Sequence, residues 1–322
     1  MNMQIRAARL ALRALEHTSP ALGGVLAERL FFTPPRTALA QSAQDSLATA
    51  RPFRVCVNDG RVAAWAWGRG PAVILVHGWG GRGARLAAAF VEPLVASGFS
   101  VVTFDAPGHG ASDGKLSSMP AVARALQAVA REVGSPFAVI AHSMGGSATA
   151  LAISQGLHLE RAVFIAPAAG PARYAEVFAA ALAVGPAAMA EMRRRSETRI
   201  GFRWSELSVP EMAVEFDIPL LIVHDRDDAT VPWSEGAAIA EAWPGAELVT
   251  TTGLGHREVV RDPGTVARAV DFVRQGASPD PLEAPASAVS DEGTWLDNDL
   301  FRRDDRRRRL FGIARALDSG SR

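Results

Sequence analysis

Short apolar runs of about five residues alternate along most of this chain with longer stretches in which apolar residues recur every three or four positions. The short runs predict buried strands, and the longer stretches predict amphipathic helices. This alternation indicates an α/β fold, with a mostly parallel central sheet and helices on both faces. We expect strands at residues 53–57, 62–67, 72–76, 100–104, 137–140, 162–165, 220–223 and 246–250. We expect helices near residues 82–96, 121–133, 235–243 and 263–274, and another directly after residue 143.

Three segments depart from that rhythm. Residues 1–50 predict an N-terminal helical extension, which Pro34 and Pro35 interrupt. Residues of about 167–215 are rich in alanine and predict helices but no strand, so we expect a small helical cap inserted into a core of residues 51–275. Residues 276–322 carry prolines and then many charges, which predicts a mobile tail whose arginine run is solvated.

The first predicted helix is amphipathic. Ile5 and Leu12 recur at helical spacing, while Arg6, Arg9 and Arg13 break the apolar stretch. We expect this helix to pack on the protein's own surface, and peripheral contact with a membrane is the alternative. No apolar run approaches the roughly 20 residues that a membrane span needs, so no span is expected.

Composition narrows the classes of partner and location. The 322 residues carry 34 basic and 34 acidic side chains, and this zero net charge argues against attraction of nucleic acid. Cys56 is the only cysteine, so an intramolecular disulfide is impossible and a reducing, cytoplasmic location is expected. We interpret Cys56 as a small buried hydrophobic residue of its strand. The sequence makes no prediction of the oligomeric state.

Candidate chemistry begins at Ser143, in the stretch AHSMGG between a predicted strand and a predicted helix. A nucleophilic serine in such a turn needs small residues two positions before and after it, and Ala141 and Gly145 provide them. The N–H groups of the following helix favour negative charge on the serine oxygen. Serine is also a good helix cap, so this stretch alone supports the two roles about equally.

A nucleophilic serine needs a base, and the base needs an acid that orients it. Asp228 follows the strand predicted at 220–223, and His256 follows the strand predicted at 246–250. Both therefore lie at the carboxyl ends of strands, where open α/β sheets place their sites. These positions make Asp228 and His256 the candidate acid and base for Ser143.

Acyl transfer also needs backbone N–H groups that face the developing oxyanion. We expect one from Met144, directly after Ser143, and one from Trp79, in the loop after the third predicted strand. The side chains of His77, Trp79 and His142 are expected to line the substrate pocket.

Five motifs, taken in order, resemble the α/β-hydrolase superfamily. They are His77-Gly78, the turn from Asp105 to Ser112, the stretch from Ala141 to Gly145, the stretch from Asp228 to Pro232, and Gly255-His256. The resemblance covers about residues 53–275 and is greatest for capped, single-domain bacterial hydrolases. It implies a Ser143–Asp228–His256 triad that cleaves a small-molecule carboxylic ester or thioester, with no cofactor and no metal. Amide, lactone and carbon–carbon bond hydrolysis are alternatives.

Two residues depart from the family pattern. Ala141 replaces a usual glycine, and Asp225 replaces the glycine that often follows the histidine at the end of the acid strand. Asp225 and Asp227 are therefore rivals for the acid. The resemblance favours Asp228, because its spacing to Val231-Pro232 matches the family.

A second enzyme class competes for the glycine-rich loop. Gly78, Gly80 and Gly83 form a G-x-G-x-x-G pattern after a strand, and Asp105 follows 22 residues after Gly83 (105 − 83 = 22). An acid at that distance suits the ribose of a dinucleotide, so an NAD(P)-dependent reductase is a rival function. It leaves the candidate triad without a role. A non-catalytic ligand-binding protein on a hydrolase fold is the third alternative.

Overall fold

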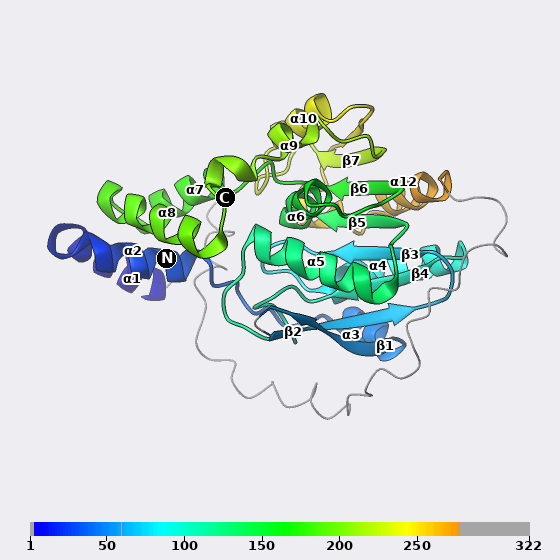
Figure 1. The fold of residues 1–322 in the computed structure, drawn as a ribbon, viewed down its shortest axis with the longest axis horizontal. Coiled ribbons are helices and arrows are strands. Elements are labelled where there is room, and N and C mark those ends of the chain that lie inside the picture. The colour runs from blue at the N-terminus through cyan, green and yellow to red at the C-terminus, as the bar shows by residue number, and fades with distance from the viewer. Residues whose placement is uncertain (1–2, 59, 277–322) are drawn as a thin grey trace.

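The computed structural model describes residues 3–58 and 60–276, and its centre is one eight-stranded sheet (Figure 1). The strands are β1 (Arg51–Val57), β2 (Gly60–Trp67), β3 (Ala72–Val76), β4 (Ser100–Phe104), β5 (Ala138–His142), β6 (Arg161–Ile165), β7 (Leu220–Asp225) and β8 (Glu247–Thr251). Their order across the sheet is β1-β2-β4-β3-β5-β6-β7-β8. The β1–β2 and β2–β4 pairs are antiparallel, and all other neighbouring pairs are parallel. The predicted α/β architecture is confirmed.

Helices cover both faces of this sheet, and a further group of helices lies beside it (Figure 1). In chain order, the helices are α1 (Met3–Thr18), α2 (Pro20–Phe31), α3 (Gln41–Ala48), α4 (Gly83–Ala96), α5 (Met119–Val133), α6 (Met144–Ser154), α7 (Ala172–Leu182), α8 (Pro186–Ile200), the 3-10 turn η1 (Trp204–Leu207), α9 (Val209–Ala213), α10 (Trp233–Ala242), α11 (Gly255–Glu258) and α12 (Pro263–Arg274). Alternate residues of β3 point to opposite faces. Ile74 belongs to the apolar layer shared with α5, α6 and α10, and Leu75 to the layer shared with α4 and α12. The parallel strands are thereby buried on both sides.

The carboxyl ends of the parallel strands define one edge of the sheet. The loop after β3 carries Trp79, and the turn after β5 carries Ser143. Asp228 follows β7, and His256 follows β8. Because parallel strands end at the same edge, residues far apart in the sequence converge there.

Four helices lie together beside the sheet, at the left of Figure 1, and we call α1, α2, α7 and α8 the helical module. The carboxylate of Glu16 on α1 accepts the N–H groups of Ala187 and Ala188, at the start of α8, at 3.0 and 3.1 Å. Ile5 and Leu12 of α1 are buried. The N-terminal helices therefore pack on helices of the 167–215 segment. The division into extension, core and cap stays a prediction.

The expectation of a buried Cys56 is wrong. Cys56 is exposed, whereas Val55 beside it is buried. Side chains alternate along a strand, so only one of these neighbours can face the core, and β1 is the edge strand. From residue 277 onward, the predicted tail lies outside the described residues. Within the described ranges, no helix has both the length and the apolar character that a bilayer crossing requires.

Candidate active site

Ser143 occupies a strained turn between β5 and α6. Its backbone has φ 56° and ψ −127°, a conformation that costs a residue other than glycine about 1–3 kcal/mol. Ser143 stands at the N-cap position of α6, yet its side chain makes no capping hydrogen bond. Gly145 is needed for the turn, because a Cβ there would lie 2.4 Å from Val76 O. The turn therefore presents the serine without using it as a helix cap.

Asp228 is the carboxylate that His256 contacts. His256 Nδ1 lies 2.7 Å from Asp228 Oδ2, and the Asp228 side chain is fully buried. Since an ionised carboxylate only accepts, His256 donates from Nδ1 and keeps a lone pair on Nε2, as a general base requires. Asp228 Oδ1 accepts the backbone N–H groups of Thr230 and Val231 at 2.8 Å each. Asp228 thus fixes both the orientation and the tautomer of His256.

His224 is a further partner of Asp228, which sequence reasoning missed. Its Nε2 lies 2.9 Å from Val231 O and 3.5 Å from Asp228 Oδ2. Burial raises the pKa of Asp228, but hydrogen bonds from His224, His256 and the Val231 N–H outweigh it and hold that pKa well below its usual range. Asp228 therefore stays ionised. The only signal in the sequence was a histidine four residues before the acid, which has no chemical signature of its own.

The two rival acids, Asp225 and Asp227, hold loops together. Asp225 Oδ2 accepts the Thr251 hydroxyl at 2.7 Å, and Asp227 Oδ2 accepts the Gly253 N–H at 2.8 Å. The first contact joins the end of β7 to the end of β8, and the second joins the loops that follow these two strands. Among the residues that the structure describes, no three or more His, Cys, Asp or Glu side chains are grouped to hold a metal ion.

His142 contacts the candidate base at both its backbone and its ring. Its Nε2 lies 3.0 Å from the carbonyl oxygen of His256, and the two ring centroids are 4.6 Å apart. Burial, followed by the neighbouring His256, lowers the pKa of His142 well below its usual value. His142 therefore stays neutral and donates from Nε2. Because His142 directly precedes Ser143 in the chain, its contact with His256 holds the base near the turn that carries the serine.

The serine and the base are not hydrogen-bonded to each other in this structure. Across residues 3–58 and 60–276, the Ser143 hydroxyl forms no hydrogen bond. Catalytic contacts of this kind are often long in ligand-free enzymes and tighten when substrate binds. The Asp228–His256 half of the candidate triad is thus formed, and the Ser143–His256 half is open.

Two backbone N–H groups near Ser143 are available to a ligand. Those of Trp79 and Met144 donate to no acceptor in the described part of the chain. The Trp79 loop lies close to the serine, because a Cβ on Gly78 would fall 2.7 Å from the Ser143 Cβ. Met144 begins α6, so its N–H also lies at the positive end of that helix. Both expected oxyanion donors therefore flank the serine.

Two buried histidines fix the loop that carries Trp79. His77 Nε2 accepts the Ala106 N–H at 2.9 Å, and its Nδ1 lies 2.7 Å from Gly78 O. His109 Nε2 accepts the Gly80 N–H at 3.1 Å. Burial lowers the pKa of His77, and it lowers the pKa of His109 to about 3. Both His77 nitrogens are bound to backbone, so neither is left for the substrate contact that the sequence suggested.

Sequence comparison identifies the family. The family model described as the alpha/beta hydrolase family matches residues 73–269. This chain belongs to the alpha/beta hydrolase family. That membership confirms the resemblance drawn from the five motifs and supports a hydrolase. No curated protein matches the sequence significantly.

Solved structures share the fold of this alpha/beta hydrolase. An esterase from Pyrococcus furiosus is 19% identical with a TM-score of 0.59, covering 76% of this chain and 98% of that chain. An esterase from Rhodococcus sp. is 19% identical with a TM-score of 0.53, covering 71% and 100%. A bromoperoxidase from Bacillus anthracis is 19% identical with a TM-score of 0.54, covering 70% and 100%. Identities this low establish the fold alone.

In this alpha/beta hydrolase the glycine-rich loop does not offer an acid to a dinucleotide. Asp105 is 1% exposed. Its Oδ1 accepts the Gly83 N–H at 2.9 Å, and its Oδ2 accepts the Arg82 Nε–H and the Ala111 N–H, each at 2.9 Å. Through these three hydrogen bonds, the Asp105 carboxylate holds together the loops after β3 and β4. Asp105, the acid that suggested a reductase, therefore binds neighbouring loops of its own chain.

The 167–215 segment is tied to α10, the helix that directly follows the loop of the candidate acid. Glu235, in the first turn of α10, accepts the Ala169 N–H at 2.7 Å and the Tyr174 hydroxyl at 3.1 Å. Arg173 Nε lies 3.4 Å from the same carboxylate. Burial, followed by the charge of Glu235, raises the pKa of Tyr174 far above its usual value. Sequence reasoning missed this link, which fixes the start of α7 near Asp228.

Proposed function

We propose that this alpha/beta hydrolase is a serine hydrolase that cleaves carboxylic esters or thioesters through an acyl-enzyme. Ser143 is the nucleophile, His256 the base and Asp228 the acid. One observation carries the proposal: the 2.7 Å Asp228–His256 contact lies beside a serine held in a strained turn that caps no helix. Strain of this kind persists where the surrounding structure enforces it, and it concentrates at active sites.

In the acylation step, Ser143 Oγ attacks the substrate carbonyl carbon and its proton passes to His256 Nε2. The carbonyl oxygen becomes an oxyanion that accepts the Trp79 and Met144 N–H groups. Loss of one such donor typically lowers the rate by about 10²–10³-fold. When the tetrahedral intermediate collapses, His256 gives the proton to the leaving alcohol or thiol, and the acyl group stays on Ser143.

In the deacylation step, His256 takes a proton from water, and the resulting hydroxide attacks the acyl carbonyl. The second intermediate collapses, Ser143 leaves with the proton of His256, and the carboxylic acid is released. Asp228 stays ionised throughout, because its hydrogen bonds lower its pKa, and it stabilises the imidazolium in both steps.

A fluorophosphonate probe tests the nucleophile directly. We expect one adduct per chain on the peptide that contains Ser143, located by mass spectrometry, and none in Ser143→Ala. Ser154→Ala, at the exposed end of the same helix α6, is the matched control and should label like the unmodified protein. His256→Ala should slow labelling by orders of magnitude.

The chemistry is then tested with matched ester, thioester and amide substrates. We expect turnover of esters or thioesters, with a burst of the leaving group equal to the enzyme concentration. A folded protein that gives no adduct, or an adduct that persists in Ser143→Ala, would overturn the mechanism. Labelling of Ser143 without turnover of any substrate would favour the non-catalytic reading instead.

A further inference from the structure

The N-terminal helices expose large apolar side chains on their outer faces. On α1, Met3 is 82% and Leu10 68% exposed; on α2, Leu22 is 59% and Val25 39% exposed. Residues seven or three positions apart share one side of a helix, so each pair marks an apolar strip along one side of its helix. A buried stripe that includes Leu12 already packs α1 onto the molecule, and this second strip has no partner among the described residues.

The acidic and the basic side chains of α1 and α2 lie on different sides of these helices. Their two acidic side chains point inward: Glu16 accepts backbone N–H groups of α8, and Glu28 pairs with two arginines of α8 at 3.1 and 2.7 Å. In contrast, Arg6, Arg13 and Arg29 are exposed. On a helix, Arg6 and Arg13 lie one turn before and after Leu10. The outer face therefore combines apolar and basic groups without an acidic one.

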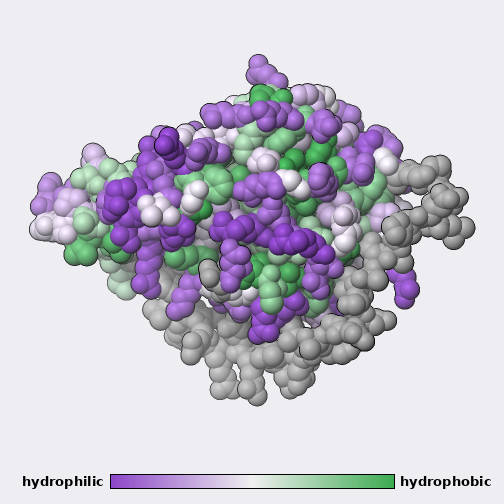
Figure 2. Space-filling model, viewed as in Figure 1, coloured by the Kyte–Doolittle hydropathy of each residue, from purple (hydrophilic) through white to green (hydrophobic). Residues whose placement is uncertain are grey.

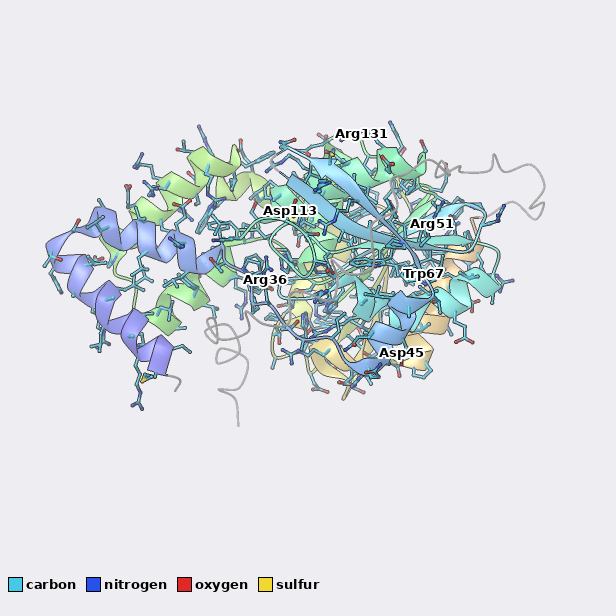
Figure 3. The ribbon with its side chains drawn as sticks, turned by 90° about the horizontal axis from the view of Figure 1, so that it is seen from below. Arg36, Asp45, Arg51, Trp67, Asp113 and Arg131 are labelled. Carbon is cyan, nitrogen blue, oxygen red and sulfur yellow. The ribbon has the colours of Figure 1, made fainter. Side chains whose placement is uncertain are left out.

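Both helices lie at one end of the molecule, below α7 and α8 in Figure 1. Seen from below in Figure 3, α1 and α2 face the viewer, and no other ribbon of the described chain lies in front of them. In Figure 2, the left end of the molecule shows green apolar atoms beside purple hydrophilic ones. In the view of Figure 3, no described helix or strand therefore lies between α1 and α2 and a large, flat partner.

We propose that this outer face of α1 and α2 docks on bilayers that contain anionic lipids. Apolar side chains on one side of a helix enter the boundary of the acyl chains, while neighbouring guanidinium groups contact lipid phosphates. A second copy of the chain is a poorer partner, because a two-fold interface would set the same arginines against each other. The proposal does not depend on the proposed catalytic chemistry.

Docking in this orientation has a consequence for the site. The helical module joins the docking face, through Tyr174 at the start of α7, to Glu235 in α10, the helix that follows the loop of Asp228. A bilayer on α1 and α2 would therefore contact the module that also contains the helices predicted to cap the site.

Co-sedimentation with vesicles tests the proposal on the full chain. We expect binding to vesicles of phosphatidylcholine with phosphatidylglycerol, little binding to phosphatidylcholine alone, and weakening by salt. An arginine near an anionic surface contributes about a fivefold gain in binding, so Arg6→Gln with Arg13→Gln should lower the partition coefficient about 25-fold. Leu10→Ser and, separately, Leu22→Ser should also weaken binding, because each removes an exposed apolar group.

Matched controls change the same residue types elsewhere. Arg131→Gln on α5, away from α1 and α2 in Figure 3, and Val214→Ser, at a site 60% exposed, should bind like the unmodified protein. Equal binding to neutral and anionic vesicles, or no binding to either, would overturn the proposal. So would a dimer in light scattering that Leu10→Ser dissociates, because the face would then serve a second copy. Circular dichroism of each variant checks that the helices are intact.

Discussion

Acid should destabilise this hydrolase through His109, which is buried without a charge. The side chain is fully buried beside the Trp79 loop, where its Nε2 accepts the Gly80 N–H at 3.1 Å and its Nδ1 lies 3.0 Å from Pro107 O. Protonation would place a second N–H against the Gly80 N–H and break that contact. Burial lowers the pKa of His109 from 6.5 to about 3, so the folded state strongly resists protonation.

The sign and size of the effect follow from that difference in pKa. Between about pH 6.5 and pH 3 the unfolded chain binds a proton that the folded chain does not, so stability falls as the pH falls. The contribution is complete above pH 6.5 and is lost progressively toward pH 3. At about pH 5, 1.5 pH units below the unfolded pKa, the loss is about 2 kcal/mol at 1.36 kcal/mol per unit.

Urea unfolding at about pH 7.5 and pH 5 measures this loss. We expect the free energy of unfolding to fall between these two pH values in both proteins. The fall should be about 2 kcal/mol smaller in His109→Gln than in the unmodified protein. Comparing each variant with itself at two pH values removes the constant cost of the substitution. His158→Gln, at an exposed position, is the matched control and should keep the full pH dependence. An unchanged pH dependence in His109→Gln would refute the reasoning.

Two further predictions concern stability. The free energy of unfolding of Ser143→Gly should be about 1 kcal/mol higher than that of Ser143→Ala, because glycine adopts φ 56° and ψ −127° without steric cost. Urea titrations compare the two variants, and equal midpoints would argue against strain. Glu28→Gln should lower the free energy of unfolding by about 1–3 kcal/mol, since it neutralises a buried carboxylate that binds two arginines of α8. Thermal melts test this against Glu176→Gln, an exposed change on α7; a loss of equal size in both would contradict it.

The strands were predictable where the signal is local. The runs at 72–76 and 100–104 coincide with β3 and β4, because a short apolar run bounded by turn residues specifies a buried strand by itself. Helix α11 was not predicted, since four residues are too few to show a helical period. The contacts of His142 with His256, and of Tyr174 with Glu235, join residues far apart in the sequence. No local pattern encodes such pairs.

The two choices that the sequence left open depend on backbone conformation. A serine caps a helix when its own backbone is extended, so that its oxygen reaches the N–H groups of the first turn. At φ 56° and ψ −127°, Ser143 makes no such bond, although its residue type and position are those of a cap. Three aspartates lie at the end of β7 and in the loop after it, and Asp228 alone contacts His256. The loop turns the Asp228 carboxylate toward His256 Nδ1, while Asp225 and Asp227 hold neighbouring backbone and hydroxyl groups. Residue type narrows each choice to a few candidates. The backbone conformation at a single turn then determines which contacts each candidate side chain makes.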